Sequence, residues 1–143
     1  HLKNVVFNDD YLLKIIPLIK ERVEKFEDFI DNTAFFFQGD LNYTNAPLVP
    51  KGRTATEIAG YLNDLVLKLD ICENWNHNEI HQIFNQYLTE KELKPKDVFM
   101  PMRVAVTGSK ETPPLFECIE VLGKDIVQRR VRLAVDFLKT MKE

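Results

Sequence analysis

The sequence has few of the residues on which covalent scaffolds and metal sites depend. Among 143 residues there are two cysteines, Cys72 and Cys118, three histidines and one tryptophan. The cysteines have neither the spacing of a disulfide framework nor nearby partners of the metal-binding kind. We therefore expect two buried or half-buried thiols in a reducing cytosol.

Long hydrophobic runs are also absent, since no apolar stretch reaches the roughly 20 residues that span a bilayer. Residues 1–10 mix polar and apolar types and end acidic, unlike a signal peptide. The chain begins with His1 rather than Met, which indicates a fragment or a trimmed chain. These features predict a cytoplasmic chain without a membrane partner, long enough for one domain or two small helical lobes.

Motifs that carry catalysis are missing as well. The sequence contains no Walker-type phosphate loop, no Gly-x-Gly-x-x-Gly and no Gly-x-Ser-x-Gly elbow. Its carboxylates fall mostly on the polar sides of expected helices, and no pair stands out as an acid/base couple. Composition and spacing therefore predict no catalytic residue.

Two histidines give a weak metal signal. His77 and His81 lie four residues apart with Glu79 between them. In zinc-protease helices the glutamate directly follows the first histidine, whereas Glu79 comes one position later, and no third ligand is apparent. We therefore predict two surface histidines and no metal site.

Apolar residues recur at helical spacing along almost the whole chain. One helix is expected up to about Arg22 and a second up to about Phe37, with a kink or break at Pro17. Residues 38–52 have the composition of a loop. A capping box at Thr54 and Glu57 opens the next helix.

Further helix signals divide the second half. Asn76 is a predicted N-cap for another helix, with Trp75 before it as a hydrophobic staple. A helix is expected over 98–107, bent at Pro101 and closed by Gly108.

The last two helices are predicted to meet at a glycine. Thr112 is expected to cap a short helix with Pro113 at its first position, and Gly123 ends that helix before the last one. No alternating run predicts a strand. The expected fold is all-α, a bundle of about seven helices, with a first lobe over 1–93 and a second over 94–143.

Charge is divided between these lobes. Residues 94–143 hold ten Lys and Arg against seven Asp and Glu, a balance of +3, whereas the first 93 residues carry −6. A basic segment on an acidic chain can mark a face that meets a polyanion, although such splits also arise on solvated helices.

Three segments are more specific: Met100–Ser109, Glu111–Glu117 and Val121–Lys124. Together they resemble the final part of bacterial-type glutamyl-tRNA synthetases. In that family an Arg-x-Ala-x-Thr-Gly-Ser run leads to a Thr-Pro-x-Leu turn, a Leu-Gly-Lys step and a closing helix. Order and spacing match over roughly 25 residues, and a looser likeness covers the rest of the chain.

The resemblance implies a role and its limits. The family is a class I aminoacyl-tRNA synthetase, whose separate catalytic domain uses ATP and Mg²⁺ and whose C-terminal helical part reads the anticodon. The catalytic sequences His-Ile-Gly-His and Lys-Met-Ser-Lys-Ser are absent from these 143 residues. The expected partners are glutamate tRNA and the catalytic domain of the parent chain. We expect a monomer that needs no cofactor itself and does not aminoacylate alone.

The resemblance also implies the anticodon-contacting residues: Arg103, Thr112, Pro113 and Leu115. Their chemistry suits this role, because an arginine fork can hold a base edge, a helix start offers free N–H groups, and a leucine can face an unstacked base.

Looser candidates for phosphate contacts are Lys110, Lys124, Arg129 and Arg130. Each site residue also has a purely structural interpretation, as an ion pair, a cap or part of the core.

An alternative function is a helical module that binds a partner helix in an apolar groove. The run Phe35-Phe36-Phe37 could line such a groove or belong to the core. Salt dependence distinguishes the two functions, because phosphate contacts weaken steeply as salt rises.

Overall fold

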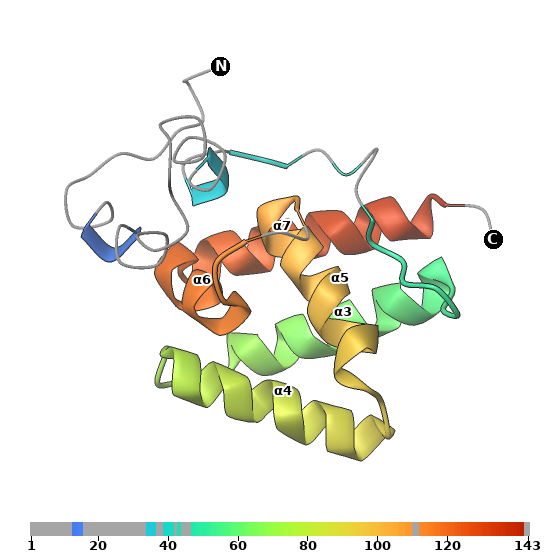
Figure 1. Cartoon of the computed structure of the whole chain (residues 1–143), viewed down its shortest axis with the longest axis horizontal. Coiled ribbons are helices and arrows are strands. Elements are labelled where there is room, and N and C mark those ends of the chain that lie inside the picture. The colour runs from blue at the N-terminus through green and yellow to red at the C-terminus, as the bar shows by residue number, and fades with distance from the viewer. Residues whose placement is uncertain are drawn as a thin grey trace.

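The computed structural model describes residues 13–15, 34–36, 39–41, 43, 47–109 and 112–141. These residues contain helices and no strand, so the predicted all-α fold is confirmed (Figure 1). The two helices expected before Phe37 lie mostly outside the described residues. The helices with described bounds are α3 (Ala55–Asp70), α4 (His77–Lys91), α5 (Pro95–Thr107), α6 (Leu115–Leu122) and α7 (Lys124–Lys139).

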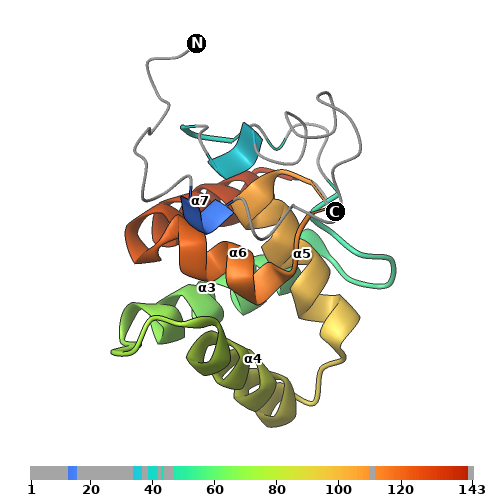
Figure 2. The same cartoon turned by 60° about the vertical axis from the view of Figure 1, so that its left-hand side comes forward.

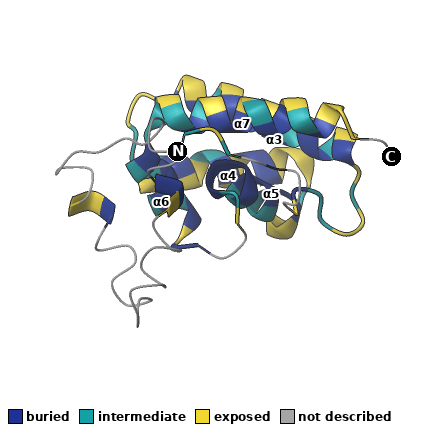
Figure 3. Ribbon diagram, turned by 90° about the horizontal axis from the view of Figure 1, so that it is seen from above, coloured by how far each residue is buried: buried dark blue, intermediate teal, exposed yellow. Residues whose placement is uncertain are grey.

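The centre of the fold is the packing of α3 against α7, with α5 lying against both. In Figure 3 both long helices show dark-blue buried residues on one side and yellow exposed residues on the other. α4 packs on α3 and α6, at the lower edge of the molecule in Figure 2. The predicted first lobe, which holds α3, thus shares a core with the predicted second lobe, which holds α7. The division into lobes stays a prediction.

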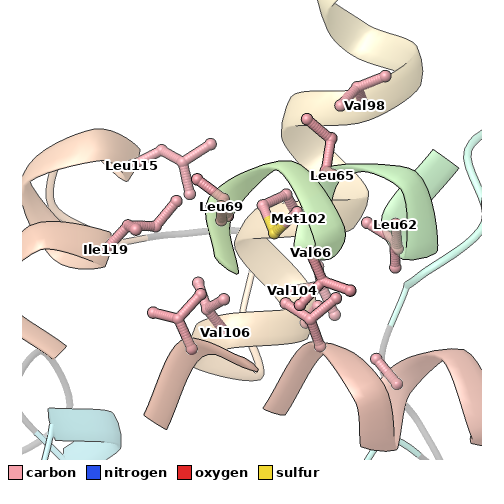
Figure 4. Packing of buried hydrophobic residues seen from close by; sticks show 14 of the residues in the cluster. Leu62, Leu65, Val66, Leu69, Val98, Met102, Val104, Val106, Leu115 and Ile119 are labelled. Carbon is pink, nitrogen blue, oxygen red and sulfur yellow. The ribbon is translucent and has the colours of Figure 1, made fainter. Parts of the chain in front are cut away.

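The core is built from the apolar stripes of these helices (Figure 4). Leu65 and Leu69 of α3 are completely buried, as are Val98 and Met102 of α5. Burial of leucine-sized side chains contributes about 1.5–3 kcal/mol each relative to exposure. The apolar periodicity of α3 is therefore the main reason that this segment folds as it does.

Two of the predicted N-caps, Thr54 and Asn76, are confirmed. The Thr54 hydroxyl accepts a hydrogen bond from the Glu57 N–H at 3.1 Å, and the Glu57 carboxylate accepts one from the Thr54 N–H at 3.0 Å. The Asn76 side chain accepts one from the Glu79 N–H at 2.9 Å. Trp75, the predicted staple residue, makes a hydrogen bond to another helix: its indole N–H donates to the carbonyl of Glu120 on α6.

Two helix boundaries differ from prediction. α5 begins at Pro95 rather than near Val98, because proline suits the first helical position and the Asp97 carboxylate accepts the Lys94 N–H at 3.1 Å. α6 begins at Leu115, so the prediction of Thr112 as its cap is wrong. The reason is Pro114, whose ring disfavours helical geometry at the residue before it.

A single glycine joins α6 to α7. Gly123 has φ +90° and ψ 157°, a backbone conformation that residues with a side chain essentially do not adopt. An added Cβ would meet nothing within 4 Å, so the backbone angle rather than space requires glycine. The predicted stop at this residue is confirmed.

Cys72 and Cys118 are both buried thiols, as predicted. Within the described part of the chain, no helix has the length and apolar character needed to cross a bilayer.

An ion-pair group joins the starts of α3 and α5. Arg53 donates to Glu57 at 3.0 Å and to the buried carboxylate of Asp97 at 3.2 Å. The Arg53 hydrogen bond, together with the Lys94 N–H, holds the pKa of Asp97 below its usual value. This carboxylate therefore stabilises the fold above the ordinary carboxyl pKa, and the contribution is lost as pH falls through the lowered value.

We expect the Asp97→Asn variant to be less stable than wild type at pH 7, with the difference shrinking in the acid range below about pH 4. Urea unfolding between pH 7 and pH 2.5 measures both stabilities. Curves for wild type and variant that stay parallel over this range would contradict the assignment.

The burial of α3 gives a matched prediction. Leu65→Ala should lower the free energy of unfolding by about 2–5 kcal/mol, because Leu65 is fully buried. Leu67→Ala, the same change two residues later at a side chain that is 54% exposed, should stay within about 0.5 kcal/mol of wild type. Urea titration measures the free energy of unfolding of the two variants. Equal losses would show that the buried face of α3 is not the one assigned here.

Candidate nucleic-acid interface

The end of α5 is closed by the segment that carried the sequence resemblance. Gly108 has φ +80°, and its N–H donates to the carbonyl of Val104 at 2.7 Å. The Thr107 hydroxyl donates to the Arg103 carbonyl at 2.7 Å and accepts the Ser109 N–H at 3.1 Å. The Thr-Gly-Ser run thus ends the helix with a left-handed glycine, as predicted, and turns the chain toward Thr112.

Arg103 lies on α5 one turn before this end and is half-buried. Its Nη1 donates to the Thr112 hydroxyl at 2.5 Å and to the Pro113 carbonyl at 2.9 Å. These bonds tie the segment before α6 to α5. The structure therefore brings together three of the four predicted anticodon residues.

Burial separates these residues. Thr112 and Pro113 are buried, and only Arg103 is partly accessible. Leu115 is 4% exposed and belongs to the core, where Figure 4 shows it near Leu69 and Ile119. Leu115 therefore packs as a core residue, which was the structural alternative to contact with a base. Pro114, which had no predicted role, is exposed between them.

The candidate phosphate contacts occupy different settings, and Lys110 lies outside the described residues. The Lys124 ammonium donates to the carbonyls of Asp70 at 3.0 Å and Cys72 at 2.6 Å, at the C-terminal end of α3. Arg129 is exposed and forms two bonds to Asp40 at 2.6 and 2.7 Å. This guanidinium holds the pKa of the Asp40 carboxyl below its usual value.

Arg130 corrects a prediction, because it is 2% exposed and cannot present its charge to a phosphate. Nη1 donates to the carbonyl of Val106 at 2.7 Å, and Nη2 donates to that of Phe35 at 2.7 Å. A helix leaves its last carbonyls unsatisfied, and Val106 is one of these on α5. Arg130 therefore joins the end of α5 to the segment that contains Phe35.

Tyr43 is a residue that sequence reasoning missed. Its hydroxyl lies 2.5 Å from the carbonyl oxygen of Ala105 and 3.0 Å from that of Arg130. Burial raises the pKa of this hydroxyl, so it keeps its proton and remains a donor. The only sequence signal was an aromatic residue inside a loop, which does not indicate a partner.

Four rings from three helices meet beside α5. His81 stacks on Phe116, with ring centroids 4.5 Å apart and planes 18° from parallel. Phe116 also meets Phe99 at 5.4 Å and Phe84 at 5.2 Å, both edge to face. Aromatic pairs prefer these offset and edge-on geometries.

The two histidines of the weak metal signal have different partners in the structure. His77 Nδ1 lies 2.8 Å from the Glu120 carboxylate, whereas His81 stacks on Phe116. No group of three or more potential metal ligands occurs among the described residues.

The phenylalanine run gives no groove where it is described. Phe35 and Phe36 are buried, with ring centroids 4.1 Å apart, and Phe37 lies outside the described residues.

Comparison with known proteins identifies the class. Residues 1–135 match the family described as "Anticodon binding domain". The chain therefore belongs to the anticodon binding domain family.

Relatives give a finer likeness. Glutamate–tRNA ligases of Protochlamydia amoebophila and Borrelia duttonii are 32% and 36% identical to the chain over 96% and 90% of its length. A solved glutamate tRNA ligase of Elizabethkingia meningosepticum has a TM-score of 0.74 at 25% identity over 94% of the chain. These comparisons confirm the resemblance drawn from the Arg103 to Lys124 segment. The chain covers 28% and 25% of the two ligases and 26% of the solved one, about a quarter of their length.

Neighbouring arginines of α7 give a matched prediction. Arg130→Met should cost about 1–3 kcal/mol of unfolding free energy for each carbonyl left buried without a donor. Arg129→Met, at an exposed side chain, should cost far less. Urea unfolding compares the two, and similar losses would show that the buried guanidinium is not a structural centre.

Proposed function

We propose that this chain is the anticodon-reading part of a glutamate–tRNA ligase and that it binds the anticodon loop of glutamate tRNA. Family membership supports anticodon binding, and the names of the relatives support glutamate tRNA as the ligand. The observation that carries the proposal is the Arg103 tie to Thr112 and Pro113, at the positions that the resemblance assigns to the anticodon.

The geometry suits recognition of an unpaired base. Sequence-specific recognition of RNA mostly takes place in loops, where bases are unstacked and their edges accessible. The planar guanidinium of Arg103 can hydrogen-bond a base edge, and its bonds to the Thr112 hydroxyl and the Pro113 carbonyl fix its plane. Arg103 is thus oriented before RNA arrives, which reduces the entropy lost on binding.

The other assigned residues have supporting parts. Thr112 and Pro113 position Arg103, and Leu115 anchors the start of α6 in the core beneath them. Arg129 is the exposed candidate for a phosphate contact, in exchange with its Asp40 partner, and Lys110 keeps this proposed role.

The parent protein would supply the chemistry. We propose that a catalytic domain elsewhere in the parent chain uses ATP and Mg²⁺ to charge glutamate tRNA, and that this chain alone only binds. The parent would act in the cytoplasm as a monomer.

The test is binding of labelled glutamate tRNA at low salt, beside the same tRNA with altered anticodon bases. Wild type should prefer the natural anticodon, and Arg103→Ala should lose about 1–3 kcal/mol of binding free energy and most of this preference. Arg132→Ala, a control at an exposed residue of α7, should affect all these tRNAs alike. Equal binding of every anticodon by wild type would overturn the proposal.

A further inference from the structure

The four-ring cluster has an inner and an outer part. Phe84 is completely buried and belongs to the core. Phe99 and Phe116 are half-buried, and His81 is exposed. The outer part therefore presents aromatic surface from α4, α5 and α6 at one place.

Core packing accounts for Phe84 but not for the outer ring. His81 is a polar residue on the exposed side of α4, where it makes no contribution to a buried core. It nevertheless lies almost parallel to Phe116, at 18°. This order of rings, from the buried Phe84 through Phe116 to His81, continues from the core to the surface.

The cluster is fixed to the Arg103 site by two connections. Phe99 and Arg103 lie four residues apart on α5, so their side chains share one face of that helix. Phe116 is the second residue of α6 and follows Pro113, whose carbonyl accepts the Arg103 bond. Phe99, Phe116 and the guanidinium are thus held by α5 and α6, and His81 of α4 stacks on Phe116.

We propose that the outer rings, His81 and Phe116, form a stacking platform for an unpaired nucleobase of the anticodon loop, next to the base read at Arg103. This inference rests on the proposed function. Splayed bases of RNA loops stack on aromatic side chains, histidine among them. An exposed ring that is connected through Phe116 and Phe99 to the helix of Arg103 would hold a second base of the same loop.

The charges around the platform favour a base over a phosphate. Glu117 and Glu120 lie on α6 with Phe116, and Glu120 already pairs with His77. A phosphate would be repelled by these carboxylates, whereas a neutral base offers a ring face. Binding here should therefore release no counterions, unlike contacts made by lysine or arginine.

The experiment uses glutamate tRNA carrying 2-aminopurine, a fluorescent purine that is quenched on stacking, at one anticodon-loop position at a time. When wild type binds, the fluorescence of 2-aminopurine should fall at one labelled position more than at the others, because the base at that position stacks on His81. His81→Ala should abolish that change and weaken tRNA binding about tenfold, within the range for loss of one stacked base.

Two variants make the result specific. His81→Phe keeps a ring and should restore both the fluorescence change and the affinity. Gln86→Ala, at an exposed residue on a different side of α4, should behave as wild type. The slope of affinity against salt should be the same for His81→Ala and wild type, because no phosphate contact is removed.

Failures of the two proposals can be told apart. If wild type distinguishes anticodons but His81→Ala matches it in affinity and at every labelled position, the platform is overturned and the proposed function stands. A reduced salt slope in His81→Ala would also overturn it, since the contact would then be ionic. If wild type does not distinguish anticodons, the proposed function fails, and this inference falls with it.

Discussion

The buried guanidinium of Arg130 is the interaction on which the arrangement around the proposed anticodon site depends. A charge that is 2% exposed is tolerated only when hydrogen bonds replace its water, and here backbone carbonyls do so. One of them belongs to Val106, at the end of α5, and another to Phe35. Tyr43 adds a donor at Ala105. The segments of Phe35, Tyr43 and Arg130 are thereby connected to the last turn of α5.

This constraint carries over to Arg103, the residue proposed to read a base. The carbonyls of Ala105 and Val106 lie within a turn of Arg103, and the same turn leads into the left-handed Gly108. Because the end of α5 cannot shift without losing several buried bonds, the loop that follows starts from a fixed point. Arg103 then closes that loop by holding Thr112 and Pro113. The proposed recognition of a base benefits from this order, since a loose loop would lose entropy on binding.

Local signals in the sequence were enough for much of the fold. The caps at Thr54 and Asn76 and the stop at Gly108 depend on residues within a few positions, so they could be predicted. Arg130 could not, because its acceptors lie 24 and 95 residues away and an arginine on a helix resembles a surface residue.

The same reasoning applies to the site itself. The start of α6 was readable in principle, since Pro114 restricts Pro113, but the threonine and proline pair resembled a helix cap more strongly. The motif located Arg103 and its partners, whereas the ring cluster draws on three helices and has no spacing of its own.

At Gly123, one residue connects α6 to α7, and its angles admit little but glycine. Because the connection is a single residue, an inserted residue would change the angle between α6 and α7. With one residue between the two helices, a displacement of α6 by bound RNA would also move α7, which packs along α3.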